Sequence, residues 1–414
     1  MEAFDVVVCG AGSAGFCAAI RASRSGARTA LIEKFASPGG ILTVTGNNSI
    51  DQFNNPFLEG NRMIIGGIGW EFSCRLAKLG FAIIPDMNAP YQKHWQYGVK
   101  VNPAAASALM DEMLLEAGVT LFYTQQAVDT VTDGRRLTDV VITTKAGLKH
   151  LNAKVFVDCT GDGDLSAWAG AAFEAGDGHG GFQPGTLRYY PAGMSCSDGD
   201  RVLNFGDNTN HVGGMDATDS DKLTAAQIEG RRAVFAQMLA EKENGERVMA
   251  IAPETAPREG RRILGKSYMH KEDFVSGRLF EDSICYSFWF VDIHRENQPT
   301  YHEYITDGST PTVRLSAMMA RDFDNLLMAG RCVSSDRATN SALRVKASCM
   351  AMGEAAGEAA AMAADSPDGN VERLDIADLK RRLAAGGAIV PGVNGFADFA
   401  EMLAPYGVTP VKVL

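Results

Sequence analysis

The chain has no closely spaced cysteines. The closest pair among its eight, Cys9 and Cys17, is eight residues apart, and no C-x-x-C motif occurs. This spacing disfavours zinc or iron–sulfur ligation and a vicinal redox disulfide. We therefore predict no metal site, and we expect mostly small, buried cysteines in a reducing cytoplasm.

Long apolar runs and an excess of positive charge are also absent. No stretch approaches the roughly 20 apolar residues that a membrane span needs. The first five residues contain no basic segment of the kind that begins a signal peptide. Lys and Arg total 39 against 50 Asp and Glu, a net charge of −11. Because such a surface repels phosphate backbones, we expect no nucleic-acid partner. The lack of long apolar runs predicts no membrane span.

The composition is that of an ordinary globular protein, with 46% hydrophobic and 21% charged residues over 414 positions. That balance argues against disorder, and the length predicts roughly two to four domains. No internal repeat or low-complexity tract is visible. A folded chain with a sizeable core is therefore expected, and a homo-oligomer is compatible with it.

The amino terminus has the pattern of a nucleotide-binding unit. A short apolar, β-branched run typical of a buried parallel strand is followed by a G-x-G-x-x-G motif. In this motif Gly10 allows a tight turn, Gly12 lets the backbone approach a pyrophosphate, and Gly15 lets the next helix pack on the strand. Ser13 and Ala14 begin that helix, whose free amides suit phosphate groups.

A second predicted strand ends at Glu33, eighteen residues after Gly15. A carboxylate there can accept hydrogen bonds from the ribose hydroxyls of an adenosine, and it would repel a 2′-phosphate. A strand, a glycine motif, a helix and an acid in this order predict a dinucleotide-binding site. Among the dinucleotides, NADP is expected to fit this site least well. The motif alone does not choose between NAD and FAD.

Three later segments favour FAD. Residues 153–164 form an apolar strand that runs into a Gly/Asp-rich turn, residues 325–336 form a strand that ends in Ala-Gly-Arg, and residues 344–357 form a helix of small residues. Together with the amino-terminal motif, they resemble the FAD-dependent oxidoreductase family, which shares the glutathione-reductase type of FAD fold. Residues 256–265 and 291–294 are similar to further segments of that family.

The chain departs from the family pattern at two places. Gly260 stands where the family usually has serine, so a polar contact is expected to be missing there. Residues 312–315 keep only the arginine and the leucine of the usual segment.

The resemblance implies FAD as the cofactor. A strand would deliver Gly330 and then an acid, Asp336, to the ribityl–pyrophosphate region. The start of the last helix would direct main-chain amides at the flavin and stabilise negative charge on its reduced form. The residues that the resemblance places at FAD are Gly10, Gly12, Ser13, Ala14, Gly15, Glu33, Lys34, Gly39, Gly40, Ile41, Thr43, Val128, Thr160, Gly161, Asp162, Gly330, Arg331, Asp336, Arg344 and Ala347.

The expected fold is α/β, a Rossmann-like FAD-binding domain of the glutathione-reductase type with an inserted α+β substrate domain. Residues 1–175, with a small β insertion at 101–146, and residues 311–414, with the flavin helix and the carboxyl-terminal tail, would form the FAD-binding domain. Residues 176–310 would form the substrate domain.

Two elements of the substrate domain are predicted in more detail. A helix over residues 223–244 has Thr224 as its N-cap and Gln227 at the third helical position, a capping-box pattern. Residues 284–293 have strand character.

The candidate acid/base is a histidine. His294 is preferred because imidazole titrates near neutral pH and because its segment resembles the family; His302, eight residues later, is the alternative. A lone histidine is more often structural than catalytic, so both readings stay open.

The candidate substrate-binding residues are basic or phenolic. Arg188 and Tyr190 lie on a predicted strand and suit a carboxylate or a polyol, unless they are a solvated arginine and a half-buried tyrosine. Arg258 and Arg261 belong to a basic cluster of which the resemblance places one member at the cleft; surface ion pairs with Glu259 are the alternative.

The predicted function is that of an FAD-dependent dehydrogenase or oxidase, which transfers hydride between FAD and a small polar substrate that is carboxylated or hydroxylated. The alternatives are a reductase that uses FADH₂ on an activated double bond, and a flavoprotein subunit for electron transfer. No second G-x-G-x-x-G occurs. Electrons would therefore be exchanged with the substrate itself or with an external acceptor or donor.

Overall fold

The computed structural model describes residues 2–90, 94–191, 201–204, 214–241, 248–296 and 298–412. A seven-stranded sheet of order β8-β2-β1-β11-β10-β9, in which β21 also pairs with β11, forms its centre. The strands are β1 (Glu2–Cys9), β2 (Thr29–Glu33), β8 (Thr120–Tyr123), β9 (Ala127–Asp133), β10 (Arg136–Thr144), β11 (Gly147–Asp158) and β21 (Leu326–Met328).

The sheet combines parallel and antiparallel pairing. β8, β2, β1, β11 and β21 are parallel to their neighbours, whereas β9, β10 and the first half of β11 form an antiparallel meander. The predicted α/β fold with a parallel sheet is thereby confirmed. The first half of the predicted β insertion is different, because β8 belongs to the parallel part of the sheet beside β2.

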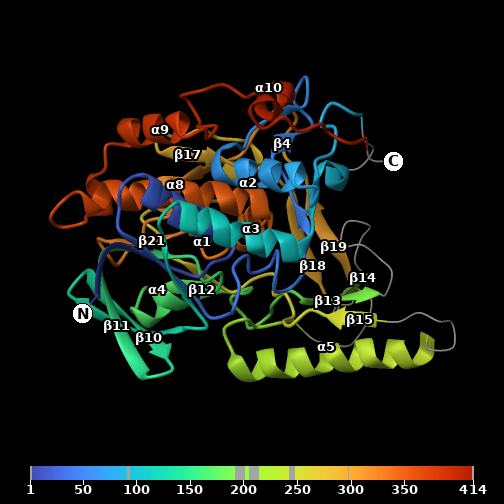
Figure 1. Ribbon diagram of the computed structural model, residues 1–414, viewed down its shortest axis with the longest axis horizontal. Coiled ribbons are helices and arrows are strands. Elements are labelled where there is room, and N and C mark those ends of the chain that lie inside the picture. Colours follow the sequence, from blue (N-terminus) through green and yellow to red (C-terminus); the bar gives the residue numbers. More distant parts are fainter. Residues whose placement is uncertain are drawn as a thin grey trace.

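Helices rich in small residues cover the sheet. α1 (Ser13–Arg24) follows β1, and α8 (Lys346–Ala364) packs along α1 although about 330 residues separate them. Figure 1 shows the two helices side by side at the middle of the molecule, with α2 (Gly67–Lys78) and α3 (Pro103–Glu116) next to them. The main hydrophobic core lies between these helices and the sheet.

Two glycines permit the close approach of α1 and α8. A Cβ at Gly353 would lie 2.0 Å from the carbonyl oxygen of Ala14, and one at Gly357 would lie 2.3 Å from that of Ala18. Both distances are far below van der Waals contact, so no other residue fits without moving a backbone. This contact fixes the start of α8 relative to the G-x-G-x-x-G turn.

A second, smaller sheet has its own core. β13 (Thr186–Pro191) lies between β14 (Arg201–Asn204) and β15 (Val248–Ile251), all antiparallel. The long helix α5 (Ser220–Glu241) runs beside these strands (Figure 1). Leu187, Tyr189, Val234 and Ala252 form a small buried cluster between the helix and the sheet.

The remaining described elements are short. The strands are β3 (Ser49–Ile50), β4 (Asn54–Asn55), β5 (Arg62–Met63), β6 (Ala82–Ile83), β7 (Val99–Val101), β12 (Phe173–Ala175), β16 (Arg261–Ile263), β17 (Ser283–Tyr286), β18 (Val291–Arg295), β19 (Gln298–Glu303) and β20 (Thr312–Arg314). The helices are α4 (Asp164–Trp168), α6 (Lys271–Val275), α7 (Arg337–Leu343), α9 (Ile376–Ala385) and α10 (Phe399–Leu403).

Two local predictions are corrected. α5 begins at Ser220 rather than at 223, because the Asp219 carboxylate accepts hydrogen bonds from the amides of Asp221 and Lys222. Thr224 is inside the helix and donates its hydroxyl to the Ser220 carbonyl. The predicted end of this helix at 244 lies outside the described residues.

The predicted strand over 284–293 is two strands, β17 and β18, that pair with β20 and β19 respectively. The residues between them, 287–290, have no strand pairing.

The described cysteines are buried, as predicted. Seven described cysteines are buried and free, as expected of small core residues; Cys196 lies outside the described residues. Among the helices that the structure describes, none is long and apolar enough to cross a membrane.

We predict that Gly357→Ala destabilises the protein by about 1–3 kcal/mol, the usual cost of overpacking a dense core. Its new methyl group would meet the backbone of α1. Chemical denaturation measures the loss. Gly395→Ala is the matched control, since a Cβ there meets nothing within 4 Å. Equal stability of the two variants would contradict the proposed role of the helix contact.

Candidate functional site

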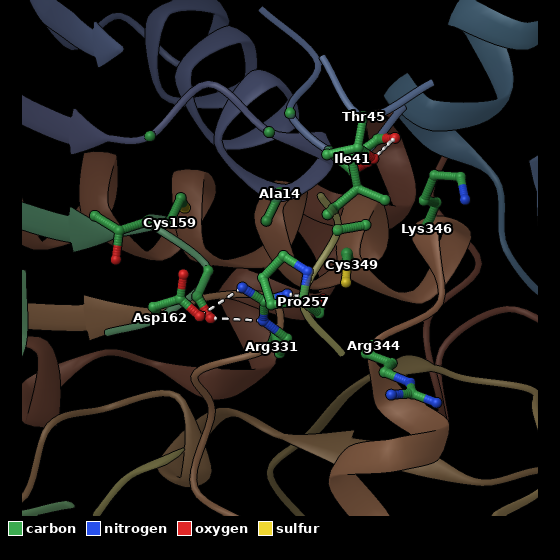
Figure 2. A pocket seen from close by; sticks show the side chains of 18 of the residues that line it. Ala14, Ile41, Thr45, Cys159, Asp162, Pro257, Arg331, Arg344, Lys346 and Cys349 are labelled. Atoms are coloured by element: carbon green, nitrogen blue, oxygen red, sulfur yellow. Dashed lines mark hydrogen bonds and ion pairs between the residues drawn. The ribbon is translucent and has the colours of Figure 1, made fainter. Parts of the chain in front are cut away.

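A cavity of about 440 Å³ lies where the carboxyl ends of the parallel strands meet the smaller sheet. Its lining includes the turns after β1, β2, β11 and β21, the start of α8, and residues of β13 and β18. Segments far apart in the sequence therefore share one cavity, part of which Figure 2 shows. The carboxyl edge of a parallel sheet is the usual position for a nucleotide.

The cradle for a phosphate group is formed by bare main chain. Gly12 is the N-cap of α1, which has no side-chain cap, so its first amides have no partner within the helix. A Cβ at Gly12 would meet nothing within 4 Å, and one at Gly40 would lie 3.2 Å from the Gly12 Cα. The open space in front of Gly12 and the positive end of α1 fit a pyrophosphate.

Glu33 lies where an adenosine ribose is expected. Its carboxylate accepts hydrogen bonds from the amides of Ala11 (2.7 Å) and Phe35 (3.0 Å), which fix its orientation. Burial raises the pKa of Glu33, although these hydrogen bonds oppose the shift. Beside it, the Lys34 ammonium lies 3.5 Å from the Glu254 carboxylate.

An ion pair closes the same side of the cavity. The Arg331 guanidinium lies 2.6 Å from the Asp162 carboxylate and also donates to the Gly161 carbonyl at 3.0 Å (Figure 2). Burial raises the pKa of Asp162, against the opposing charge of Arg331. The fully buried Asp158 holds this turn by accepting from the backbone and hydroxyl of both Thr160 and Ser166.

Gly260 makes room for this ion pair. A Cβ at position 260 would lie 2.2 Å from the Asp162 carboxylate oxygen. A serine there would push the carboxylate away from Arg331. Glycine at position 260, where serine is usual, therefore leaves space for the Asp162–Arg331 ion pair.

The start of α8 forms another wall of the cavity. Its N-cap is Val345, and no side chain caps the helix. Lys346 follows, 7% exposed and among the lining residues. Burial lowers the pKa of Lys346 to about 8, with partial compensation by the charge of Asp51.

The Asp292 carboxylate lies close to three basic side chains, those of His294, His302 and Arg344. It lies 3.3 Å from His294 Nε2, 3.1 Å from His302 Nε2 and 3.3 Å from the Arg344 guanidinium. Burial would raise the pKa of Asp292, but the hydrogen bond from His294 and the charges of Arg344 and Arg258 hold it well below its usual range. Asp292 is therefore a carboxylate, and His294 lines the cavity beside it.

Most of the residues predicted from the sequence line the cavity. Those that do are Gly10, Gly12, Ser13, Ala14, Glu33, Lys34, Gly40, Ile41, Thr160, Gly161, Asp162, Arg188, Arg258, His294, Gly330, Arg331 and Arg344.

Four residues that were predicted to contact the cofactor make contacts within the protein instead of lining the cavity. A Cβ at Gly15 would lie 1.7 Å from the Gly10 carbonyl oxygen, as expected of a packing glycine. Gly39 donates its amide to the Ala11 carbonyl and has a positive φ of 107°. Thr43 donates its hydroxyl to the Pro38 carbonyl, and Ala347 donates its amide to the Asp51 carbonyl. These contacts are structural, and none of the four residues lines the cavity.

Asp336 has a different role from the predicted one. One carboxylate oxygen caps α7 by accepting from the Thr339 amide at 2.7 Å, and the other accepts from the Lys271 amide at 2.6 Å. The acid predicted for the ribityl–pyrophosphate region is thus used within the protein. Arg331, directly after Gly330, stands at the cavity instead.

Arg261, Tyr190 and Val128 also lie outside the lining. Arg261 is paired with Asp164 at 2.7 Å, so Arg258 is the member of the basic cluster that faces the cavity. The Tyr190 hydroxyl packs over Gly46, where a Cβ would lie 1.7 Å from it. The cavity is lined by Ala127, the neighbour of Val128, because alternate residues of a strand face opposite sides.

Sequence reasoning missed Asp51, Glu254, Trp289, Asp292 and Lys346, all of which line the cavity. One signal was available: Lys346 is the only charged residue in the first eight positions of α8, which are otherwise small or apolar. A lysine in such a segment is costly to bury without a purpose.

A family model described as FAD dependent oxidoreductase matches residues 5–203 and 188–383. No curated protein matches the chain.

Several solved structures resemble it at low identity. A geranylgeranyl bacteriochlorophyll reductase-like protein from Thermoplasma acidophilum is 11% identical over 98% of this chain and 96% of that one, with a TM-score of 0.45. A flavoprotein/dehydrogenase from Cytophaga hutchinsonii is 14% identical over 92% and 84%, with a TM-score of 0.45. The myxobacterial chondrochloren halogenase CndH is 12% identical over 92% and 78%, with a TM-score of 0.44.

We predict that Gly12→Ala weakens FAD binding by about 10- to 100-fold, equivalent to the usual 1–3 kcal/mol of steric strain. The added methyl group would project into the space that the pyrophosphate needs, whereas the φ of −68° suits alanine. Flavin absorbance of the purified protein and titration of the apoprotein with FAD measure the effect. The melting temperature of the apoprotein should stay unchanged, and full flavin content would contradict the assignment of the cradle.

We also predict that Lys346→Met stabilises the apoprotein at neutral pH. Because burial lowers the pKa of Lys346 to about 8 in the folded state, the folded chain binds fewer protons than the unfolded chain between pH 8 and 10.5. Stability therefore rises with pH across this window, and below it the buried charge costs up to about 3 kcal/mol.

Urea unfolding of the apoprotein at pH 7 and pH 10 measures this difference. The gain from Lys346→Met should be largest at pH 7 and shrink towards pH 10. Lys100→Met, a change at a half-buried lysine of β7, is the control and should give a much smaller difference. A destabilised Lys346→Met protein at pH 7 would show that the ammonium is well compensated.

Proposed function

The chain belongs to the FAD-dependent oxidoreductase family, and from this membership we propose that it transfers hydride between FAD and a small polar substrate. FAD is the cofactor, and the residues around Gly12, Glu33 and the start of α8 fit its phosphate, ribose and ring portions. We further propose that the FAD-binding part is of the glutathione-reductase type. It would comprise residues 1–175 and 311–414, with residues 176–310 as a substrate domain.

The observation that carries the proposal is that His294 lines the same cavity as the nucleotide motif. Bound FAD supplies hydride chemistry, and the protein has to position the substrate and to move the accompanying proton. A histidine at the cavity wall can accept or donate that proton near neutral pH. This arrangement serves both oxidation of a substrate and the reverse reduction.

Asp292 orients the imidazole of His294. Its carboxylate lies 3.3 Å from His294 Nε2 and accepts a hydrogen bond from the ring. The negative charge of Asp292 stabilises the imidazolium that forms. The main-chain amide of His294 donates to Gln183 at 3.0 Å and fixes the backbone.

We predict that His294→Gln slows substrate-dependent bleaching of the flavin by about 10²- to 10⁴-fold, the usual contribution of a general acid or base. The assay mixes holoprotein anaerobically with hydroxy acids, amino acids and sugars. Flavin content should stay at the wild-type level, because His294 is separate from the phosphate cradle.

His302→Gln is the matched control. His302 contacts the same carboxylate, is 41% exposed at its side chain and does not line the cavity. It should therefore have a much smaller effect on bleaching. The reverse result, with full activity in His294→Gln and loss in His302→Gln, would assign the proton transfer to His302. Absence of bleaching with every substrate would favour an electron-transfer subunit.

A further inference from the structure

The start of α8 places a buried cation, Lys346, in the cavity. Within the described part of the chain, no hydrogen bond or ion pair reaches Nζ of Lys346, which is 7% exposed. Figure 2 shows this side chain at the right of the view and Asp162 at the left. A buried ammonium without a hydrogen-bond acceptor is unfavourable, so a ligand is expected to supply one.

The charges around Lys346 define one end of the cavity, here called the Lys346 end: Asp51, Arg188 and Lys346. Asp51 interacts electrostatically with both cations, and its carboxylate accepts a hydrogen bond from the Ser49 hydroxyl at 2.9 Å. Lys346 and Arg188 are both cations, and Asp51 is the one carboxylate among these three residues. Burial lowers the pKa of Arg188 to about 10, so the guanidinium also remains charged at neutral pH.

Two further groups near Lys346, Lys100 and Cys349, do not offset its positive charge. Lys100 on β7 adds a further positive charge without lining the cavity. Burial raises the pKa of the Cys349 thiol to about 12, so Cys349 is neutral. The negative charges of FAD are on its phosphates, which the cradle places at Gly12. Oxidised FAD would therefore add no negative charge beside Lys346.

Two other basic residues of the cavity, Arg344 and Arg331, have partners within the protein. Arg344 donates to Gln183 and to the carbonyls of Arg258 and Asp292. Arg331 is paired with Asp162. These guanidiniums are held by the protein, whereas Lys346 is available for a ligand.

We propose that the Lys346 end binds a carboxylate group of the substrate, with Lys346 and Arg188 as the two donors. The inference rests on the proposed function and narrows its substrate class to carboxylic acids. The negative charge of a carboxylate would offset the buried charge of Lys346, and its two oxygens can accept hydrogen bonds from an ammonium and a guanidinium together.

The test uses holoprotein and two carboxylates that flavin does not readily oxidise, acetate and benzoate, each compared with its neutral amide. Binding is followed by the change in flavin absorbance and by calorimetry. The carboxylates should bind, and the amides should not. Lys346→Met and Arg188→Met should each weaken benzoate binding by about 10- to 100-fold, as expected for a hydrogen bond to a charged group.

The double variant and the pH dependence make the test more specific. The losses in the two single variants should add incompletely in the double variant, because both donors contact one carboxylate. In the wild type, affinity should fall as the pH rises through the range in which Lys346 loses its proton, and this fall should disappear in Lys346→Met. Melting of each apoprotein checks that the variants fold.

Lys100→Met is the control for a general electrostatic effect, since this lysine acts on Lys346 but does not line the cavity. It should change benzoate affinity only about twofold. The midpoint potential of the bound flavin is measured in parallel. A lower potential in Lys346→Met with unchanged benzoate affinity would assign the charge to the flavin and overturn the proposal, as would equal binding of the amides.

These outcomes are separate from those of the proposed hydride transfer, because benzoate binding needs no turnover. Carboxylate binding without any bleaching would leave the subsite in place and remove hydride transfer. Bleaching by uncharged substrates, with no binding of carboxylates, would do the opposite.

Discussion

The contact between α1 and α8 is the constraint on which the cavity depends. Gly353 and Gly357 let the backbone of α8 approach the carbonyls of Ala14 and Ala18, and a side chain at either glycine would force the helices apart. Both helices begin at the cavity and neither has a side-chain cap. Their close packing therefore sets the separation of two positive helix ends. One faces the expected pyrophosphate, and the other faces the expected flavin ring.

The charges along the cavity are distributed unevenly, and this gives a ligand a direction. At the end where the adenosine is expected, the carboxylates of Glu33, Glu254 and Asp162 outnumber the two neighbouring cations, Lys34 and Arg331. Cations exceed carboxylates at the Lys346 end. A cofactor whose phosphates lie between the two ends leaves the positive end for a second, negatively charged molecule. The same asymmetry discourages an anionic substrate from occupying the adenosine end.

The parts of the site that were predictable from the sequence are those where the backbone restricts the residue type. Gly10 adopts a φ of 94° and lies against the Cys159 backbone, so only glycine fits and the motif is readable. Side-chain roles were less predictable, because a carboxylate after a strand can serve the protein itself. Asp336 caps α7, whereas Asp292, two residues before the predicted His294, orients it. Which of these acids faces the cavity depends on how β18 and the segment after β21 are placed in the fold, which the sequence pattern does not contain.

The phosphate cradle and Arg188 belong to different parts of the fold, and this bears on substrate specificity. The phosphate cradle is built from main chain of the central sheet, so its chemistry depends little on side-chain identity. Arg188 comes from β13, whose sheet has a separate small core beside α5. Changes in that core can move Arg188 without touching the α1–α8 contact. The chain can therefore change which small molecule it accepts while keeping its cofactor, because the two tasks depend on different packing interactions and meet only at the cavity.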